Sequence, residues 1–237
     1  LMGTGVRVGN GRVIISYNGA STGVITQTTG LPSGSLFPIG TTTNTFVGDA
    51  GNGNTDTCTF LVTVNDVEAP VISSVPSSQN VANDPAMCSA VVTWTAPVVT
   101  DNCTPAVTSN YSSGSIFPVG TTTVTYIATD PSGNADTASF TITVADMEAP
   151  VITSMPMSDT VFNDFGQCNA IISWISPTAT DNCAISNWTS NYNSGDAIPV
   201  GINVIEYIVT DSTGNSDTAS FTLTVIDFEP PVIQCPS

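Results

Sequence analysis

The chain has 237 residues and a net charge of −17 at pH 7, because 19 Asp and Glu residues face two Arg, no Lys and no His. This charge excludes nucleic-acid binding, which needs basic residues to neutralise phosphates, and it favours divalent cations as partners. Without His or Lys the common catalytic triads, zinc sites and Schiff-base chemistry are absent, so we predict no catalytic residues and no enzymatic activity. Direct membrane insertion is not expected, since no apolar run reaches transmembrane length.

A repeat of about 80 residues organises the chain. Asp66-Val-Glu-Ala-Pro-Val-Ile recurs as Asp146-Met-Glu-Ala-Pro-Val-Ile and as Asp227-Phe-Glu-Pro-Pro-Val-Ile, at steps of 80 and 81 residues. We therefore predict an incomplete unit at 1–65, complete units at 66–145 and 146–226, and the start of a further unit at 227–237. Because the chain begins within one unit and ends in another, we expect it to be a segment of a longer protein.

Alternation of apolar and polar residues predicts β-strands in every unit. In chain order, the apolar stripes are Phe60, Val62 and Val64; Ala90, Val92 and Trp94; Val124, Tyr126 and Ala128; Phe140, Ile142 and Val144; Ala170, Ile172 and Trp174; Ile205, Tyr207 and Val209; and Phe221, Leu223 and Val225. Turn-forming clusters such as Asp130-Pro-Ser-Gly-Asn separate the stripes. The fold class that we predict is all-β, with tandem immunoglobulin-like β-sandwich repeats of about 80 residues.

Several co-linear motifs resemble the hyalin repeat (HYR) family. In the second unit they are Val91-Val-Thr-Trp-Thr-Ala-Pro, Thr100-Asp-Asn-Cys, Phe117-Pro-Val-Gly-Thr-Thr-Thr-Val-Thr-Tyr and Thr129-Asp-Pro-Ser-Gly-Asn. The third unit repeats them as Ile172-Ser-Trp, Thr180-Asp-Asn-Cys, Ile198-Pro-Val-Gly and Thr210-Asp-Ser-Thr-Gly-Asn. The resemblance covers residues 66–237 well, 31–65 fairly well and 1–30 poorly. It implies an immunoglobulin-like fold, a role in extracellular adhesion and no catalytic residues.

Six cysteines in Thr-, Ser- and Gly-rich units indicate an oxidising compartment. Cys88 and Cys103 recur as Cys168 and Cys183, and the first unit lacks both equivalents, which favours the pairs Cys88–Cys103 and Cys168–Cys183 within units. A straight strand after Cys88 would instead hold Cys103 more than about 20 Å away. Pairing between neighbouring units therefore stays open. We expect Cys58 and Cys235 to pair with residues outside this chain.

Acidic and amide residues recur where consecutive units should meet. In a sandwich that is entered at one end and left at the other, the linker, the loop after the second strand and the last hairpin converge at the junction. The set is Asp66, Glu68, Asp101, Asn102, Asp130, Asn134 and Asp136 at the first junction, and Asp146, Glu148, Asp181, Asn182, Asp211, Asn215 and Asp217 at the second. Ca²⁺ takes six to eight such oxygens, so we predict junctional calcium. The alternative is that these are ordinary solvated turn residues.

Two functional interpretations follow. The first is a structural and adhesive segment of a long secreted or cell-surface filament, stiffened by calcium, whose partners are further repeats, other filament subunits or glycans. The second is a carbohydrate- or ligand-binding module, for which an exposed aromatic such as Trp188 would be needed.

Overall fold

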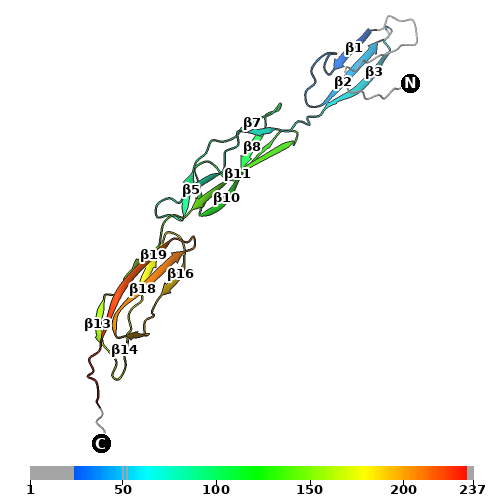
Figure 1. Ribbon diagram of the computed structural model, residues 1–237. Coiled ribbons are helices and arrows are strands. Elements are labelled where there is room, and N and C mark those ends of the chain that lie inside the picture. Colours follow the sequence, from blue (N-terminus) through cyan, green and yellow to red (C-terminus); the bar gives the residue numbers. More distant parts are fainter. Residues whose placement is uncertain (1–23, 50, 52, 234–237) are drawn as a thin grey trace.

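The computed structural model describes residues 24–49, 51 and 53–233, which form β-strands joined by turns and loops. Figure 1 shows three β-rich units that follow one another along an extended array. Within the described ranges there is no helix whose length and hydropathy would let it span a bilayer. The predicted fold class, all-β with tandem immunoglobulin-like repeats, is confirmed.

The first unit contributes one described antiparallel sheet with the strand order β1-β2-β3. Its strands are β1 (Val24–Thr29), β2 (Gly40–Asp49) and β3 (Thr55–Val64). The rings of Phe46 and Phe60 stack with centroids 6.0 Å apart.

The second unit pairs a four-stranded sheet with two short antiparallel ladders. The sheet has the order β5-β11-β10-β8, with β5 parallel to β11, and the ladders are β4-β7 and β6-β9. The strands are β4 (Val71–Ser73), β5 (Gln79–Ala82), β6 (Ser89–Val92), β7 (Val98–Thr100), β8 (Ala106–Ser109), β9 (Ser115–Pro118), β10 (Gly120–Thr129) and β11 (Ala135–Ala145).

The third unit repeats this topology. Its sheet has the order β13-β19-β18-β16, and its ladders are β12-β15 and β14-β17. The strands are β12 (Val151–Thr153), β13 (Asp159–Phe162), β14 (Asn169–Ile171), β15 (Thr178–Thr180), β16 (Ile185–Ser190), β17 (Ala197–Pro199), β18 (Gly201–Asp211) and β19 (Ser216–Ile226).

Each complete unit has its own core, built from the alternating stripes. In the second unit the core consists of Ala90, Val92, Phe117, Val124, Tyr126, Phe140, Ile142 and Val144, with Trp94 packed against it. Inward-facing residues at every second position put one face of β10 and β11 on this core. The long β10–β11 and β18–β19 hairpins turn at Gly133 (φ 91°) and Gly214 (φ 101°), where a side chain would be strained. These hairpins present Asp130 and Asp211 at the N-terminal end of their units.

One disulfide joins two neighbouring units, between Cys88 and Cys183, with Cα atoms 4.9 Å apart. The prediction that Cys88 pairs with Cys103, and Cys168 with Cys183, is therefore wrong, and the pairing between units is the correct alternative. Cys88 precedes β6 at the C-terminal end of its unit and Cys103 follows β7 at the N-terminal end, so the two thiols of a unit lie at opposite ends. Such a separation exceeds the roughly 7 Å that a disulfide tolerates.

Three cysteines among the described residues are free: Cys58, Cys103 and Cys168. The expectation that Cys58 pairs beyond this chain stays a prediction. Cys235 lies outside the described residues.

Candidate metal centre

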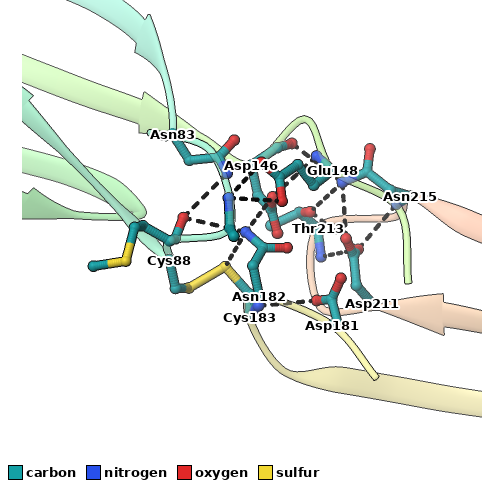
Figure 2. The surroundings of a disulfide bond; sticks show 12 residues. Asn83, Cys88, Asp146, Glu148, Asp181, Asn182, Cys183, Asp211, Thr213 and Asn215 are labelled. Atoms are coloured by element: carbon teal, nitrogen blue, oxygen red, sulfur yellow. Dashed lines mark hydrogen bonds between the residues drawn. A yellow bond between two sulfur atoms is a disulfide. The ribbon is translucent and has the colours of Figure 1, made fainter. Parts of the chain in front are cut away.

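Three segments of the chain converge where the second and third units meet; we call this region the second junction. They are the linker that starts at Asp146, the loop after β15 with Asp181 and Asn182, and the β18–β19 turn with Asp211. Carboxylate oxygens of Asp146, Asp181 and Asp211 all lie within 4.8 Å of one another. Figure 2 shows these side chains beside the Cys88–Cys183 bond.

Burial makes this cluster costly without a cation. Asp146 is 5% and Asp211 2% exposed, and the chain has no Lys or His to neutralise them. Both Arg residues, Arg7 and Arg12, lie outside the described residues. Two carboxylates at this separation repel by roughly 3 kcal/mol at the effective dielectric constant of a protein surface.

Asp146 and Asp181 each have one carboxylate oxygen held by hydrogen bonds and one that is not. Asp146 Oδ1 accepts from the Glu148 backbone N–H (3.2 Å) and from Asn182 Nδ2 (3.2 Å), and Asp181 Oδ2 accepts from the Cys183 N–H (3.0 Å). Asp146 Oδ2, Asp181 Oδ1 and Asn182 Oδ1 are buried and have no hydrogen-bond partner among the described residues. Buried oxygens without donors are the groups that a cation would satisfy.

Asp211 is fixed more completely than its neighbours. Its Oδ1 accepts from the backbone N–H groups of Thr213 (2.8 Å), Gly214 (2.6 Å) and Asn215 (2.9 Å), and its Oδ2 accepts from Asn215 Nδ2 (2.8 Å). Burial alone would raise the pKa of Asp211, but the hydrogen bonds from Asn215, Thr213 and Gly214 outweigh it and lower the pKa. The Asp211 carboxylate therefore stays charged, and its turn holds it in one orientation.

The second unit supplies the other wall of the junction. The Glu148 carboxylate accepts the Ala86 N–H (2.9 and 3.2 Å), and Asn182 Nδ2 donates to the Met87 carbonyl (3.2 Å). The Met147 N–H donates to Asn83 Oδ1 (3.0 Å). An open hollow of about 270 Å³ lies at this boundary. Ala86 and Glu148 line it together with Asp181 and Asn182 of the third unit. Solvent and ions therefore reach the edge of the cluster at Glu148, Asp181 and Asn182.

The first junction, where the linker at Asp66 meets the second unit, has a cluster that includes a thiol in place of a third carboxylate. Asp66, Asp101 and Cys103 offer ligand atoms within 4.8 Å of one another. Asn102 Nδ2 donates to Asp66 Oδ1 (3.3 Å), and Asp101 Oδ1 is buried without a partner among the described residues. Asp66 and Asp101 are half-buried, so this cluster is less enclosed than the second.

A thiol faces the linker carboxylate at the first junction. Cys103 Sγ and a carboxylate oxygen of Asp66 lie within 4.8 Å of each other, and Asp66 Oδ2 is buried without a hydrogen-bond partner among the described residues. Hydrogen bonds from Cys103 and Asn102 lower the pKa of Asp66. The contact with Asp66, burial and the charges of Asp66, Asp101 and Asp130 raise the pKa of Cys103 to about 11. The thiol therefore stays protonated and neutral at pH 7.

Comparison with known families identifies the repeat. The HYR domain matches this chain three times, over residues 5–64, 65–144 and 145–225. The chain belongs to the HYR domain family. Hyalin from Strongylocentrotus purpuratus is 36% identical over 230 residues, which cover 90% of this chain and 19% of that protein. Hyalin from Lytechinus variegatus is 34% identical over 248 residues, covering 98% of this chain and 47% of that protein.

The chain thus spans about a fifth and about half the length of these two relatives. A bacterial relative, the serine-rich adhesin for platelets of Staphylococcus aureus strain MSSA476, is 29% identical over 150 residues, covering 54% of this chain and 7% of that protein. Among solved structures, Drosophila N-cadherin EC1-3 is 14% identical with a TM-score of 0.33, covering 81% of this chain and 79% of that one. Human mucin-like protocadherin EC1-2 is 12% identical with a TM-score of 0.35, covering 67% and 98%. Structural likenesses of this size carry no inference about function.

Within the HYR units, the predicted site residues fall into two groups. The linker Asp, the loop Asp and Asn, and the hairpin Asp and Asn gather at each junction as expected: Asp66, Asp101, Asn102, Asp130 and Asn134, and Asp146, Asp181, Asn182, Asp211 and Asn215. Asp136 and Asp217 turn elsewhere, because Oδ2 of each accepts a backbone N–H from the first strand of its unit, Ile72 or Ile152, at 2.9 Å. Glu148 turns back to the preceding unit. Glu68 is exposed, and its backbone N–H donates to Asp66 Oδ1 at 3.2 Å.

Cys103 belongs to the cluster at the first junction, and the sequence analysis did not predict it there. Its position directly after Asp101 and Asn102 was the available signal. Because Asp101 and Asn102 lie in the loop at the first junction, the next residue of that loop, Cys103, lies at the junction too.

Proposed function

We propose that this HYR segment binds Ca²⁺ at both junctions and that the ions stiffen the array. The observation that carries the proposal is the second junction, where Asp146 is buried and its Oδ2, Asp181 Oδ1 and Asn182 Oδ1 lack donors among the described residues. Carboxylate and amide oxygens are the ligands that Ca²⁺ prefers, and the residues present fit it.

The proposed ligands are Asp146, Asp181, Asn182 and Asp211 at the second junction and Asp66, Asp101, Asn102 and Asp130 at the first. Asn134 and Asn215 orient the hairpin carboxylates, since the Nδ2 of each donates a hydrogen bond of 2.8 Å to Oδ2 of the Asp in its own turn. They also donate to the linker carbonyls of Asp66 and Asp146 at 3.2 Å. A bound ion supplies charge neutralisation, and because its ligands come from the linker and from the following unit it resists bending at the joint.

The function that this arrangement supports is a structural and adhesive segment of a longer extracellular protein. Membership in the HYR family and the two hyalin relatives support a role as a repeated structural unit. The bacterial relative's name, an adhesin, supports attachment at a cell surface. Its partners would be further repeats of the same polypeptide, other filament subunits or surface glycans, and its role would be non-enzymatic.

Thermal unfolding with and without Ca²⁺ tests the proposal. Ca²⁺ at 100 times the Kd of a junction should stabilise the folded chain by about 2.7 kcal/mol for that site, because it binds the folded state and not the unfolded chain. Asp146→Asn removes a charged ligand and should abolish most of the shift that comes from the second junction. Asp159→Asn is the matched control, since Asp159 is exposed and its Oδ1 accepts the N–H of Thr160 beside it.

Two results would contradict calcium as a structural element. One is a melting temperature that EDTA does not lower in the parent chain. The other is an equal calcium shift in Asp146→Asn and Asp159→Asn.

The ligand-binding alternative receives no support from Trp188. Trp188 is 38% exposed, and its ring packs edge-to-face on Tyr207 with centroids 6.0 Å apart. The hydroxyl of Tyr207 in turn accepts from Trp174 Nε1. This indole therefore takes part in packing, and we do not propose a sugar platform there.

A further inference from the structure

The Cys88–Cys183 disulfide ends the same loop that carries two proposed calcium ligands. Asp181 and Asn182 directly precede Cys183, and the Cys183 N–H donates to Asp181 Oδ2 at 3.0 Å. Asn182 Nδ2 lies 3.6 Å from Cys183 Sγ. The position of the sulfur thus fixes the backbone from which both ligand side chains project (Figure 2).

The other half of the disulfide belongs to the wall formed by the second unit. Cys88 follows Met87, whose carbonyl accepts from Asn182 Nδ2 at 3.2 Å, and Ala86, whose N–H binds Glu148. The bond therefore clamps the loop of residues 181–183 onto the loop of residues 84–88. Asp146 contacts this clamp through Asn182 and is 5% exposed, with Oδ2 unpaired among the described residues.

The first junction provides an internal comparison without the clamp. Cys103 occupies the position of Cys183 there, and it is free. Residues 1–57 contain no cysteine, so the first unit has no counterpart of Cys88. Asp66 and Asp101 at this junction are half-buried, whereas Asp146 is buried.

We propose that the Cys88–Cys183 disulfide is a positioning element of the second calcium site, which makes this junction bind Ca²⁺ at least tenfold more tightly than it does with Cys88 and Cys183 reduced. The inference rests on the proposed calcium function. Holding ligands in place before the ion arrives removes an ordering cost from binding. Coupling between two equilibria is reciprocal, so Ca²⁺ must make the disulfide harder to reduce by the same factor. A factor of ten corresponds to about 30 mV for this two-electron couple.

Calorimetric titration with CaCl₂ measures the first half of this coupling. Cys103→Ser/Cys168→Ser serves as the background, so that no free thiol near the junctions exchanges with the disulfide. Adding Asp66→Asn isolates the second site, and adding Asp146→Asn isolates the first. Cys88→Ser/Cys183→Ser should weaken the second site at least tenfold and leave the first unchanged.

The second half is measured on the parent chain without ligand substitutions. In a dithiothreitol buffer, two electrons and two protons pass to Cys88 and Cys183 to give two thiols, and dithiothreitol closes to its cyclic disulfide. Peptide mass analysis after acid quenching gives the fraction reduced. The potential should fall by about 30 mV or more when Ca²⁺, at a concentration that saturates both the oxidised and the reduced chain, replaces EDTA, and Mg²⁺ should shift it less. A purely structural crosslink would show no such calcium dependence.

Three outcomes are informative. Equal calcium affinity with and without the disulfide overturns the inference. A potential that ignores Ca²⁺ in a chain that binds Ca²⁺ also overturns it, while leaving the proposed function intact. An oxidised parent chain that binds no Ca²⁺ at either junction overturns the proposed function itself.

Discussion

The carboxylate of Glu148 accepts the backbone N–H of Ala86 from the preceding unit, at 2.9 and 3.2 Å. Glu229 repeats the contact one unit later, where its Oε1 accepts the N–H of Gly166 at 2.7 Å. Ala86 has φ 60° and Gly166 φ 73°, so both loops turn their N–H outward with a left-handed backbone. The glutamate of the linker thus ties the linker to the preceding unit, and we call this contact the latch.

Removing this latch should loosen the second junction. Glu148→Ala deletes a charge-assisted hydrogen bond worth about 1 kcal/mol at an exposed site. We expect residual dipolar couplings to report a wider range of orientations between the second and third units, with the core signals of each unit unchanged. Glu148→Gln keeps one acceptor oxygen, so its range of orientations should lie between those of the parent chain and of Glu148→Ala.

Glu206→Ala is the matched control for the latch, because Glu206 is exposed on β18 and away from the linker. A junction that is equally loose in Glu148→Ala and Glu206→Ala would show that the latch carries no rigidity.

The core tryptophans should contribute through a hydrogen bond as well as through packing. Trp94 Nε1 donates to the Tyr126 hydroxyl at 2.7 Å, and Trp174 does the same to Tyr207. Trp94→Phe removes the donor at a half-buried site, so we expect a loss of about 1–3 kcal/mol in urea unfolding. Trp188→Phe, at a 38% exposed position, should cost less than about 1 kcal/mol.

A double-mutant cycle with Tyr126→Phe separates the two contributions. A coupling energy near zero between positions 94 and 126 would assign the whole effect to packing.

Acid should weaken the third unit through Asp211. The pKa of Asp211 is lowered in the folded protein, so its contribution is complete above the unfolded pKa of 3.8 and is lost as pH falls through the folded pKa. In EDTA, the urea concentration at the unfolding midpoint of the parent chain should therefore decrease once the pH falls below about 4. Asp211→Asn should be less stable at pH 7 by about 2 kcal/mol, because its turn donors lose a charged acceptor.

The pH profile is the decisive comparison for Asp211. If the parent and Asp211→Asn chains lose equal stability between pH 5 and pH 3, other carboxylates carry the acid sensitivity.

Cys103 should be a slow thiol. Its pKa of about 11 leaves on the order of a thousandth of it as thiolate at pH 8, so alkylation by iodoacetamide should run roughly a hundredfold slower than for an ordinary thiol. The rate should rise with pH up to about 11. Measurement in a Cys58→Ser/Cys168→Ser background reports this thiol alone among the described free cysteines.

Asp66→Asn tests the cause of the slow reaction. It removes the acceptor and the charge that raise the pKa of Cys103, so alkylation at pH 8 should accelerate. An unchanged rate would place the cause in steric shielding instead.

The amino-acid sequence by itself determined the repeat, the strands, the cores and the meeting of acids at the junctions. Alternation with a period of two is local, and it correctly placed Val124 and Phe140 inside. Strand direction was enough to bring Asp66 near Asp101, and Asp146 near Asp181 and Asp211, because successive elements must end at one edge or the other.

The tertiary structure decided how the units are joined. The partner of Cys88 is Cys183, 95 residues away, and the partner of Glu148 is Ala86, 62 residues away. Asp136 was diverted to the N–H of Ile72 because the first strand docks beside β11. Contacts of this kind depend on how one folded unit seats on the next, and no local pattern in a repeat distinguishes a neighbour within the unit from its equivalent across the boundary.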